Sequence, residues 1–309
     1  MTAQQAGPTV IGPEVEPRLD WLALTEALID GHTRPRAELA DVFLTRGDDT
    51  LLSRAALIDG LGSLVKTATV YPGNPARGLA AVNGAASLFD DTTGQLEALV
   101  DFHLLTRWKT AGDSLLAARL LARPSSHRIT LVGAGTVARS MAAAYGRLFP
   151  AARFTVWSRT HANARALADE IGGEATPDLE GAVRNADILC TATIAREPLI
   201  RGDWLQPGQH LDLIGAFRAD MREVDDTALA RARLFVDSRA TTIEHIGELK
   251  DPIARGVIGP GDIVADYYDI AAGRFARGSD DEITIAKNGG GAHLDLMTAR
   301  YLLDRARAG

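Results

Sequence analysis

The stretch ITLVGAGTVA, residues 129–138, decides the fold of most of this chain. It runs from four strand-forming residues through two glycines into an alanine-rich segment with helical spacing. Gly133 permits a tight turn, Gly135 lets the backbone approach a ligand, and Ala138 allows close packing of helix on sheet. Because free N–H groups at the start of a helix attract negative charge, the stretch predicts the pyrophosphate turn of a dinucleotide-binding domain. The cofactor-binding residues expected in this turn are Gly133, Ala134, Gly135, Thr136 and Val137.

Short strand-like runs alternate with helical segments after this turn. The runs lie at 154–156, 188–192, 211–214 and 234–236. Such alternation predicts parallel βαβ units, and therefore an α/β fold with a doubly wound parallel sheet of the Rossmann type. Cys190 lies inside one of these apolar runs, so we expect a buried side chain rather than a nucleophile.

The N-terminal third gives weaker signals. A helix is expected from Leu19 to Asp30, and the run 78–89 is typical of a strand that turns through a hairpin into 96–100. These elements predict a small mixed sheet. A long helix is expected at 104–122, and Pro124 marks its end and a domain boundary.

Composition and charge argue against several classes of function. The 309 residues carry a net charge of -7 without a basic block, so nucleic acid is not an expected partner. The sequence has neither the pattern of a signal peptide nor a run of about 18 apolar residues, so no membrane segment is expected. One cysteine and seven scattered histidines offer no disulfide and no pair at metal-ligand spacing. We therefore expect a cytoplasmic protein that binds no metal.

The end of the second predicted strand bears on the choice of cofactor. NAD sites place an Asp or Glu there for the ribose hydroxyl, whereas NADP sites supply a cation for the 2′-phosphate. This chain has Ser158, Arg159 and Thr160, which offer a guanidinium fork and two hydroxyl donors. The pattern predicts NADP(H) in preference to NAD(H), with a solvated surface charge at Arg159 as the alternative interpretation.

Three further stretches occur in order along the chain: LTRWKTA at 105–111, WSRT at 157–160 and IGAFRADMREVD at 214–225. They resemble the L-T-x-x-R-T-A-A, W-N-R-T and G-A-x-x-P-x-x-R-E-L-D segments of the ornithine cyclodeaminase and mu-crystallin family. The W-N-R-T form belongs to the NADPH-binding mu-crystallin branch. The resemblance extends from about Pro35 to Leu303.

This resemblance implies a homodimer with two domains in each copy. A Rossmann domain at 123–282 would be inserted in a mixed α+β domain, formed by residues 1–122 and 283–309, for substrate binding and dimerisation. The second of these segments contains the final helix, which is expected from His293 to about Ala306.

The resemblance also implies chemistry at a C=N bond beside a carboxylate. Lys66 resembles the family's substrate-contacting lysine, and Arg36 resembles its carboxylate-binding arginine. Lys109 stands where the family has arginine, so the charge is kept but the bidentate fork is lost. We expect Lys66 and Lys109 to be catalytic and to bind substrate together with Arg36, with a solvated surface charge as the alternative for Lys66 and for Arg36.

Phe217 separates the reactions that the family performs. The cyclodeaminase branch has an Asp there for proton transfer, which a phenylalanine cannot perform. The expected activity is therefore NADP(H)-dependent reduction of a cyclic ketimine carboxylate of the pyrroline-2-carboxylate or piperideine-2-carboxylate type. One alternative is an ornithine cyclodeaminase or an alanine-dehydrogenase-like amino acid oxidoreductase. Another is a non-catalytic protein that binds NADP(H).

The same resemblance extends the cofactor site beyond the glycine turn. Thr193 and Ile194 match family positions that line the cofactor, and the KNGGGA segment at 287–292 matches a segment near the nicotinamide. Asn288 stands there in place of a serine. The remaining residues expected to bind cofactor are Asn163 and Ile214.

Overall fold

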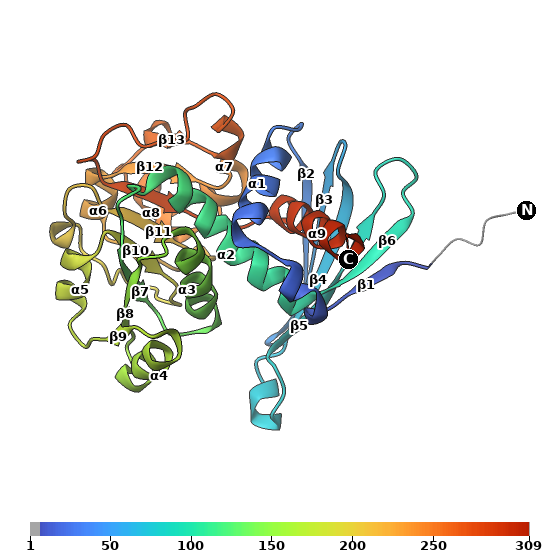
Figure 1. Ribbon diagram of the computed structural model, residues 1–309, viewed down its shortest axis with the longest axis horizontal. Helices are drawn as coiled ribbons and strands as arrows, with labels where there is room; N and C mark the ends of the chain where they lie inside the picture. The colour runs from blue at the N-terminus through green and yellow to red at the C-terminus, as the bar shows by residue number, and fades with distance from the viewer. Residues whose placement is uncertain (1–6, 309) are drawn as a thin grey trace, which may run out of the picture. The chain divides into compact units, whose positions relative to one another are not determined.

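The computed structural model describes residues 7–308 and divides the chain into two compact units. Unit 1 takes the chain up to Lys109 and again from Gly291, and unit 2 spans Thr110–Gly290. The boundaries differ from the expected ones at 122/123 and 282/283. The first observed boundary falls inside helix α2, Phe102–Leu121, which continues from one unit into the other (Figure 1). The second differs because strand β14, Thr284–Lys287, pairs with β11 and β12 of unit 2.

Unit 2 contains an eight-stranded sheet in the order β13-β12-β14-β11-β10-β7-β8-β9, and all of its strand pairs are parallel. The strands besides β14 are β7 Arg128–Val132, β8 Arg153–Trp157, β9 Glu174–Ala175, β10 Ile188–Thr191, β11 His210–Leu213, β12 Arg233–Val236 and β13 Ile263–Ala265. The helices after α2 are α3 Thr136–Leu148, α4 His161–Ile171, α5 Leu179–Asn185, α6 Asp226–Arg231, α7 Arg239–Thr242 and α8 Gly247–Ala254. This is the expected Rossmann sheet, and the α/β fold class is confirmed.

Helices cover both faces of this sheet. On one face, Val183 of α5 and Leu249 of α8 join the buried cluster that contains Leu211 of β11. On the other face, the Tyr145 hydroxyl of α3 donates to the Asp212 carboxylate, also in β11. Both faces are therefore buried, as near-continuous apolar strands require.

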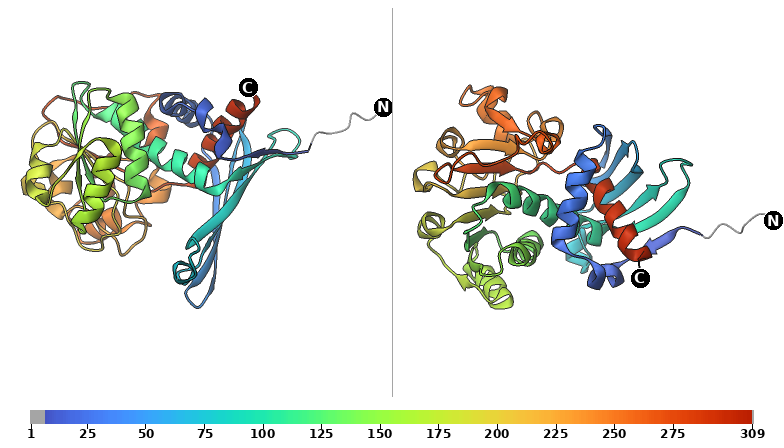
Figure 2. Two further views of the ribbon diagram at one scale, coloured as in Figure 1. Left: turned by 60° about the horizontal axis from the view of Figure 1, so that its bottom comes forward. Right: turned by 45° about the horizontal axis from the view of Figure 1, so that its top comes forward.

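Unit 1 contains a six-stranded sheet in the order β1-β6-β5-β4-β3-β2. Its strands are β1 Thr9–Ile11, β2 Glu38–Arg46, β3 Asp49–Ile58, β4 Gly62–Val70, β5 Val82–Phe89 and β6 Leu96–Asp101. Only β1 pairs in parallel, so the sheet is mixed, and β5 and β6 form the expected hairpin. The sheet is larger than expected because β2, β3 and β4 form a long antiparallel meander (Figure 2).

Two helices of unit 1 complete its core. Helix α1, Trp21–His32, packs against helix α9, Ala292–Arg307, and α9 also contacts β3 and β4. Leu64 on β4 and Leu88 on β5 are fully buried, and they lie opposite one another in the sheet. The short 3-10 helices of the two units are Pro13–Arg18, Asn74–Arg77, Gly202–Trp204, Pro260–Asp262 and Tyr267–Asp269.

Candidate active site

The glycine turn of unit 2 connects the carboxyl ends of three neighbouring strands. Gly133 has a φ of 121°, and a Cβ there would lie 2.5 Å from the carbonyl oxygen of Ala192. The Gly133 N–H donates to the Trp157 carbonyl at 2.8 Å, which ties β7 to the end of β8. No atom lies within 4 Å of a Cβ built on Gly135, so the backbone is open to a ligand there. Gly135 is the N-cap of α3 and brings no side chain to its first N–H groups, which suits an anion.

A pocket of about 450 Å³ adjoins this turn. The predicted cofactor residues that line it are Gly133, Ala134, Gly135, Ser158, Arg159, Thr160, Asn163, Thr193 and Ile194. Trp157, which was not predicted, also lines it. The predicted residues Thr136, Val137, Ile214 and Asn288 are not part of the lining. Arg159 is exposed, and within residues 7–308 it forms no ion pair, so its guanidinium is available to a phosphate.

Asn288 lies just beyond the end of β14, beside β11. Its backbone N–H donates to Leu213 at 3.2 Å, and its side chain is almost completely buried. Neither its amide nitrogen nor its amide oxygen has a hydrogen-bond partner in the part of the chain that the structure describes. A buried amide with donor and acceptor both unused suits a ligand that also carries an amide, as nicotinamide does. The residues present therefore fit a nicotinamide dinucleotide.

Two of the three candidate substrate residues, Lys66 and Lys109, belong to a largely buried group of charged residues, here called the cation cluster: Arg54, Lys66, Lys109, His293 and Asp295. The Lys66 ammonium donates to the Asp295 carboxylate at 2.8 Å, and both side chains are buried. Burial lowers the pKa of Lys66, and the charge of Asp295 opposes this. Lys66 also lies 4.9 Å from the centroid of the Phe102 ring.

Lys109 leaves the cluster with positive charge in excess, because Lys66 pairs with Asp295 and Arg54 pairs with Asp41. Lys109 is buried, and Arg54 lies opposite Lys66 in the pairing of β3 with β4. Burial and the charge of Lys109 lower the pKa of His293 to about 3, so this imidazole is neutral at pH 7. Burial alone would raise the pKa of Asp295, but the surrounding cations hold it below its usual value. An excess of buried positive charge favours an anionic ligand.

Arg36 and Arg54 differ from expectation in opposite ways. Arg36 is exposed and precedes β2, so it does not share the burial of Lys66 and Lys109. Arg54 was not predicted, although its charge acts on both Lys66 and Asp295. Its guanidinium donates to the Asp41 carboxylate at 2.6 and 3.2 Å. No motif marks this arginine, and only the strand pairing brings it to the cluster.

Phe217 follows the end of β11 in unit 2 and is largely exposed. The guanidinium of Arg218 lies 5.6 Å from the centre of its ring. Ile194, after β10, is also exposed. These two loops therefore present exposed apolar side chains, and the exposed acid nearest to Phe217 in its loop, Asp220, pairs with Arg218 and Arg196.

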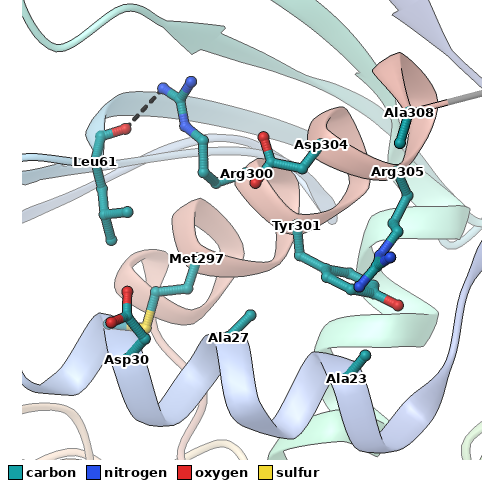
Figure 3. A pocket seen from close by; sticks show the side chains of 10 residues that line it. All are labelled: Ala23, Ala27, Asp30, Leu61, Met297, Arg300, Tyr301, Asp304, Arg305 and Ala308. Carbon is teal, nitrogen blue, oxygen red and sulfur yellow. Dashed lines mark hydrogen bonds between the residues drawn. The ribbon is translucent and has the colours of Figure 1, made fainter.

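Another pocket, of about 410 Å³, lies between α1 and α9 of unit 1 (Figure 3). Its main polar groups are already engaged, since Arg300 donates to the Leu61 carbonyl at 2.7 Å and the Tyr301 hydroxyl bonds to the Asp20 backbone. It is lined by none of the predicted site residues. Across residues 7–308, no cluster of His, Cys, Asp and Glu is suited to a metal ion, and no helix is long and apolar enough to cross a membrane.

Comparison with known proteins identifies the family. The model of the ornithine cyclodeaminase/mu-crystallin family matches residues 56–309. The chain is 52% identical over 292 residues to a Delta(1)-pyrroline-2-carboxylate reductase from Paracoccus denitrificans, and the match covers 92% of each chain.

Solved structures agree over almost the whole length. The Thermococcus litoralis Delta(1)-pyrroline-2-carboxylate reductase, solved with NADH and L-proline, matches with a TM-score of 0.87 and 26% identity, covering 97% of this chain and 98% of that one. An archaeal alanine dehydrogenase dimer with bound NAD matches with a TM-score of 0.87 and 27% identity, covering 97% and 96%. In sequence and in fold, the chain belongs to the ornithine cyclodeaminase/mu-crystallin family.

Proposed function

We propose that this chain is an NADP(H)-dependent oxidoreductase that reduces a cyclic ketimine carboxylate of the pyrroline-2-carboxylate type to the cyclic amino acid. The observation that carries the proposal is the excess of buried positive charge around Lys66 and Lys109, because such a substrate carries a carboxylate. The similarity to a pyrroline-2-carboxylate reductase over 92% of the chain supports the same reaction.

The residues have separate tasks in this proposal. Lys109 and Lys66 bind and orient the substrate carboxylate, and the bound NADP(H) supplies the hydride. Phe217 offers no proton, and we propose that the imine binds in its protonated form, so that hydride transfer to carbon gives the neutral amine directly. The rate should then fall as the pH rises through the pKa of the imine.

The test is to follow NADPH absorbance against five- and six-membered cyclic imino acids. Ornithine and alanine, each with an oxidised cofactor, serve as comparison substrates. We expect turnover of at least one cyclic imino acid and no conversion of ornithine to proline. Turnover of ornithine or alanine alone would move the chain to the amino acid oxidoreductases. Cofactor binding without any turnover would indicate a non-catalytic protein.

The preference for NADP(H) rests on Arg159, which is exposed at the pocket and free of ion pairs within the described residues. A charge-assisted bond to phosphate contributes about 1.5–3 kcal/mol, roughly ten- to a hundredfold in affinity. Arg159→Ala should lower the affinity for NADPH by this factor and leave that for NADH nearly unchanged. Arg165→Ala, an exposed arginine on α4 outside the pocket lining, is the matched control. Equal losses for the two cofactors would refute the preference.

We also propose that the chain forms a homodimer through the open face of the unit 1 sheet, defined by Ala40, Val42, Leu44, Ala55, Leu57, Val65, Leu99 and Val10 at alternating strand positions. Several of these apolar side chains are exposed, whereas the opposite face packs on α9. Exposed apolar surface of this kind is typical of an interface. The similar archaeal alanine dehydrogenase is described as a dimer, which supports a second copy as the occupant.

Light scattering at micromolar concentration tests the dimer. Val42→Asp combined with Leu44→Asp should yield monomers, because both charges lie on the open face. Phe43→Asp introduces an exposed charge on the other face of the same strand and should leave the dimer intact. A wild-type monomer would refute the proposal.

A further inference from the structure

Glu223 is a completely buried carboxylate of unit 2 that lies outside the pocket lining. Its Oε1 accepts hydrogen bonds from the Thr193 N–H at 2.9 Å and from the Thr193 hydroxyl at 2.8 Å. Thr193 follows the carboxyl end of β10 and lines the cofactor pocket. One oxygen of the carboxylate therefore fixes the first of two loops.

The other oxygen fixes the second loop. Oε2 accepts from the Gly215 N–H at 2.8 Å and from the Ala216 N–H at 3.2 Å, just after β11. It also accepts from the Thr191 hydroxyl at 2.8 Å, at the end of β10. The loops that follow two adjacent strands are thus joined through one side chain.

Only a carboxylate satisfies this arrangement. All five partners are donors, and a carboxylate accepts at both oxygens without donating. A glutamine of the same shape would direct its amide N–H groups at other donors. The loops also come very close together, because a Cβ on Gly215 would collide with the Glu223 carboxylate and with the Thr193 backbone.

The backbone of Glu223 is itself fixed. Its N–H donates to the Glu248 carboxylate at 2.7 Å, and its carbonyl accepts from Leu199 and Ile200, each at 3.0 Å. Because the backbone of Glu223 is held in place, its carboxylate in turn fixes the positions of the two loops.

The order of the strands indicates which half of a dinucleotide these loops would meet. In the sheet, β7 carries the glycine turn and has β8, which precedes Arg159, on one side. On its other side lie β10 and then β11. A dinucleotide bound across the carboxyl edge at the switch point has its adenosine half on the β8 side and its nicotinamide half over β10 and β11.

We propose that Glu223 is the positioning residue that sets the nicotinamide half of the site, through the loops that carry Ile194 and Phe217. This proposal rests on the proposed function only in requiring a nicotinamide dinucleotide. It goes beyond that function because it makes a buried residue outside the pocket lining responsible for the position of the nicotinamide ring that carries the hydride.

The test compares two ligands in Glu223→Gln by calorimetry: NADPH and 2′-phospho-ADP-ribose, which lacks the nicotinamide. We expect about a tenfold or greater loss of NADPH affinity and less than about a threefold change for the fragment. Glu223→Asp, which keeps the carboxylate, should recover part of the loss. Equal losses for the two ligands, or no loss, would overturn the proposal.

Asp187→Asn is the matched control. Asp187 is a buried carboxylate just before β10, at the opposite end of that strand from Thr191. It accepts from the His127 and Arg128 N–H groups at 3.1 and 3.0 Å. Its substitution should lower stability without distinguishing the two ligands. If Glu223→Gln does not fold, Thr191→Val removes one donor to the same carboxylate outside the pocket lining and should give a smaller loss for NADPH alone.

Both readouts are binding constants, so they remain informative if no imine is turned over. A wild-type chain that binds NADPH without reducing any imine would contradict the proposed function and leave the role of Glu223 open to the same test.

Discussion

The cation cluster of unit 1 and the charges around Glu223 in unit 2 are both largely buried, but their charges are balanced in different ways. In unit 2, Glu223 and Glu248 accept mainly from backbone N–H groups. In unit 1, Lys66 and Lys109 share the single buried carboxylate of Asp295. Buried charges that backbone groups satisfy therefore hold the structure in place, whereas buried charge in excess favours the binding of a ligand of opposite charge.

The ammonium groups of two buried lysines show the same contrast. The Lys287 ammonium of unit 2 donates to the carbonyls of Leu213 and Asn288, each at 2.7 Å. The Lys66 ammonium of unit 1 donates to Asp295. Burial lowers the pKa of both lysines, because it disfavours the charged ammonium form in each case. Lys287 is therefore a structural group, and Lys66 keeps donors for a substrate.

The largest effect is expected from breaking the Lys66–Asp295 pair. Asp295→Ala leaves a buried ammonium without its counter-charge, which typically costs about 3–5 kcal/mol in the free energy of unfolding. The double variant Lys66→Met/Asp295→Leu removes both charges and should recover most of this loss. Urea denaturation curves measure both. A loss under about 1 kcal/mol in Asp295→Ala would mean that Lys66 is hydrated and that its charge does not depend on Asp295.

The fold of unit 2 was predictable because its signals are local. Strand, glycine turn and helix are contiguous at 129–138, and the doubly wound sheet is confirmed. The sheet of unit 1 was largely missed for a physical reason. Strand β2 is exposed along its whole length, so burial imposes no apolar alternation on its sequence.

The candidate site was predictable where a motif marks it. Arg159 and Thr193 lie in the pocket as expected, while the family resemblance drew attention to Lys66 and Lys109. Arg54 and Glu223 could not be assigned roles in the same way. Their partners lie on other strands and loops, so their tasks depend on register and on long-range contacts.

A smaller effect is expected from substitution of Lys109. This variant distinguishes substrate binding in unit 1, which should weaken, from cofactor binding in unit 2, which should not. Lys109→Ala should lower kcat/KM for the cyclic imine by roughly ten- to a hundredfold, the scale of one lost charge-assisted contact. NADPH affinity should change little. Lys109→Arg restores the family's residue and should retain most of the activity. Full activity in Lys109→Ala would refute its role with the carboxylate.

The smallest effect concerns acid stability, where the two units should differ in sign. His293 in unit 1 and His210 in unit 2 are both buried, which lowers the pKa of each to about 3. The folded state then binds fewer protons than the unfolded chain between about pH 3 and 6.5, so each histidine costs stability as the pH falls below about 6.5. In unit 2, burial raises the pKa of Asp212 and of Glu248 to about 7. These carboxyls take up protons in the folded state first, so they add stability as the pH falls from 7.

Between pH 6.5 and 5.5 we therefore expect α9 of unit 1 to lose about 1 kcal/mol of protection in hydrogen exchange, since one pH unit of linkage corresponds to about 1.4 kcal/mol. Strand β11 of unit 2 should keep its protection or gain some, because two carboxyls oppose its one histidine. His293→Asn should remove the loss in α9 and leave β11 as it was. Peptide-resolved exchange separates the two segments within one sample, so a general weakening of the chain cannot imitate the result. Equal losses of protection in α9 and β11 would contradict the prediction. They would mean that the buried titratable groups of the two units change stability with pH in the same direction.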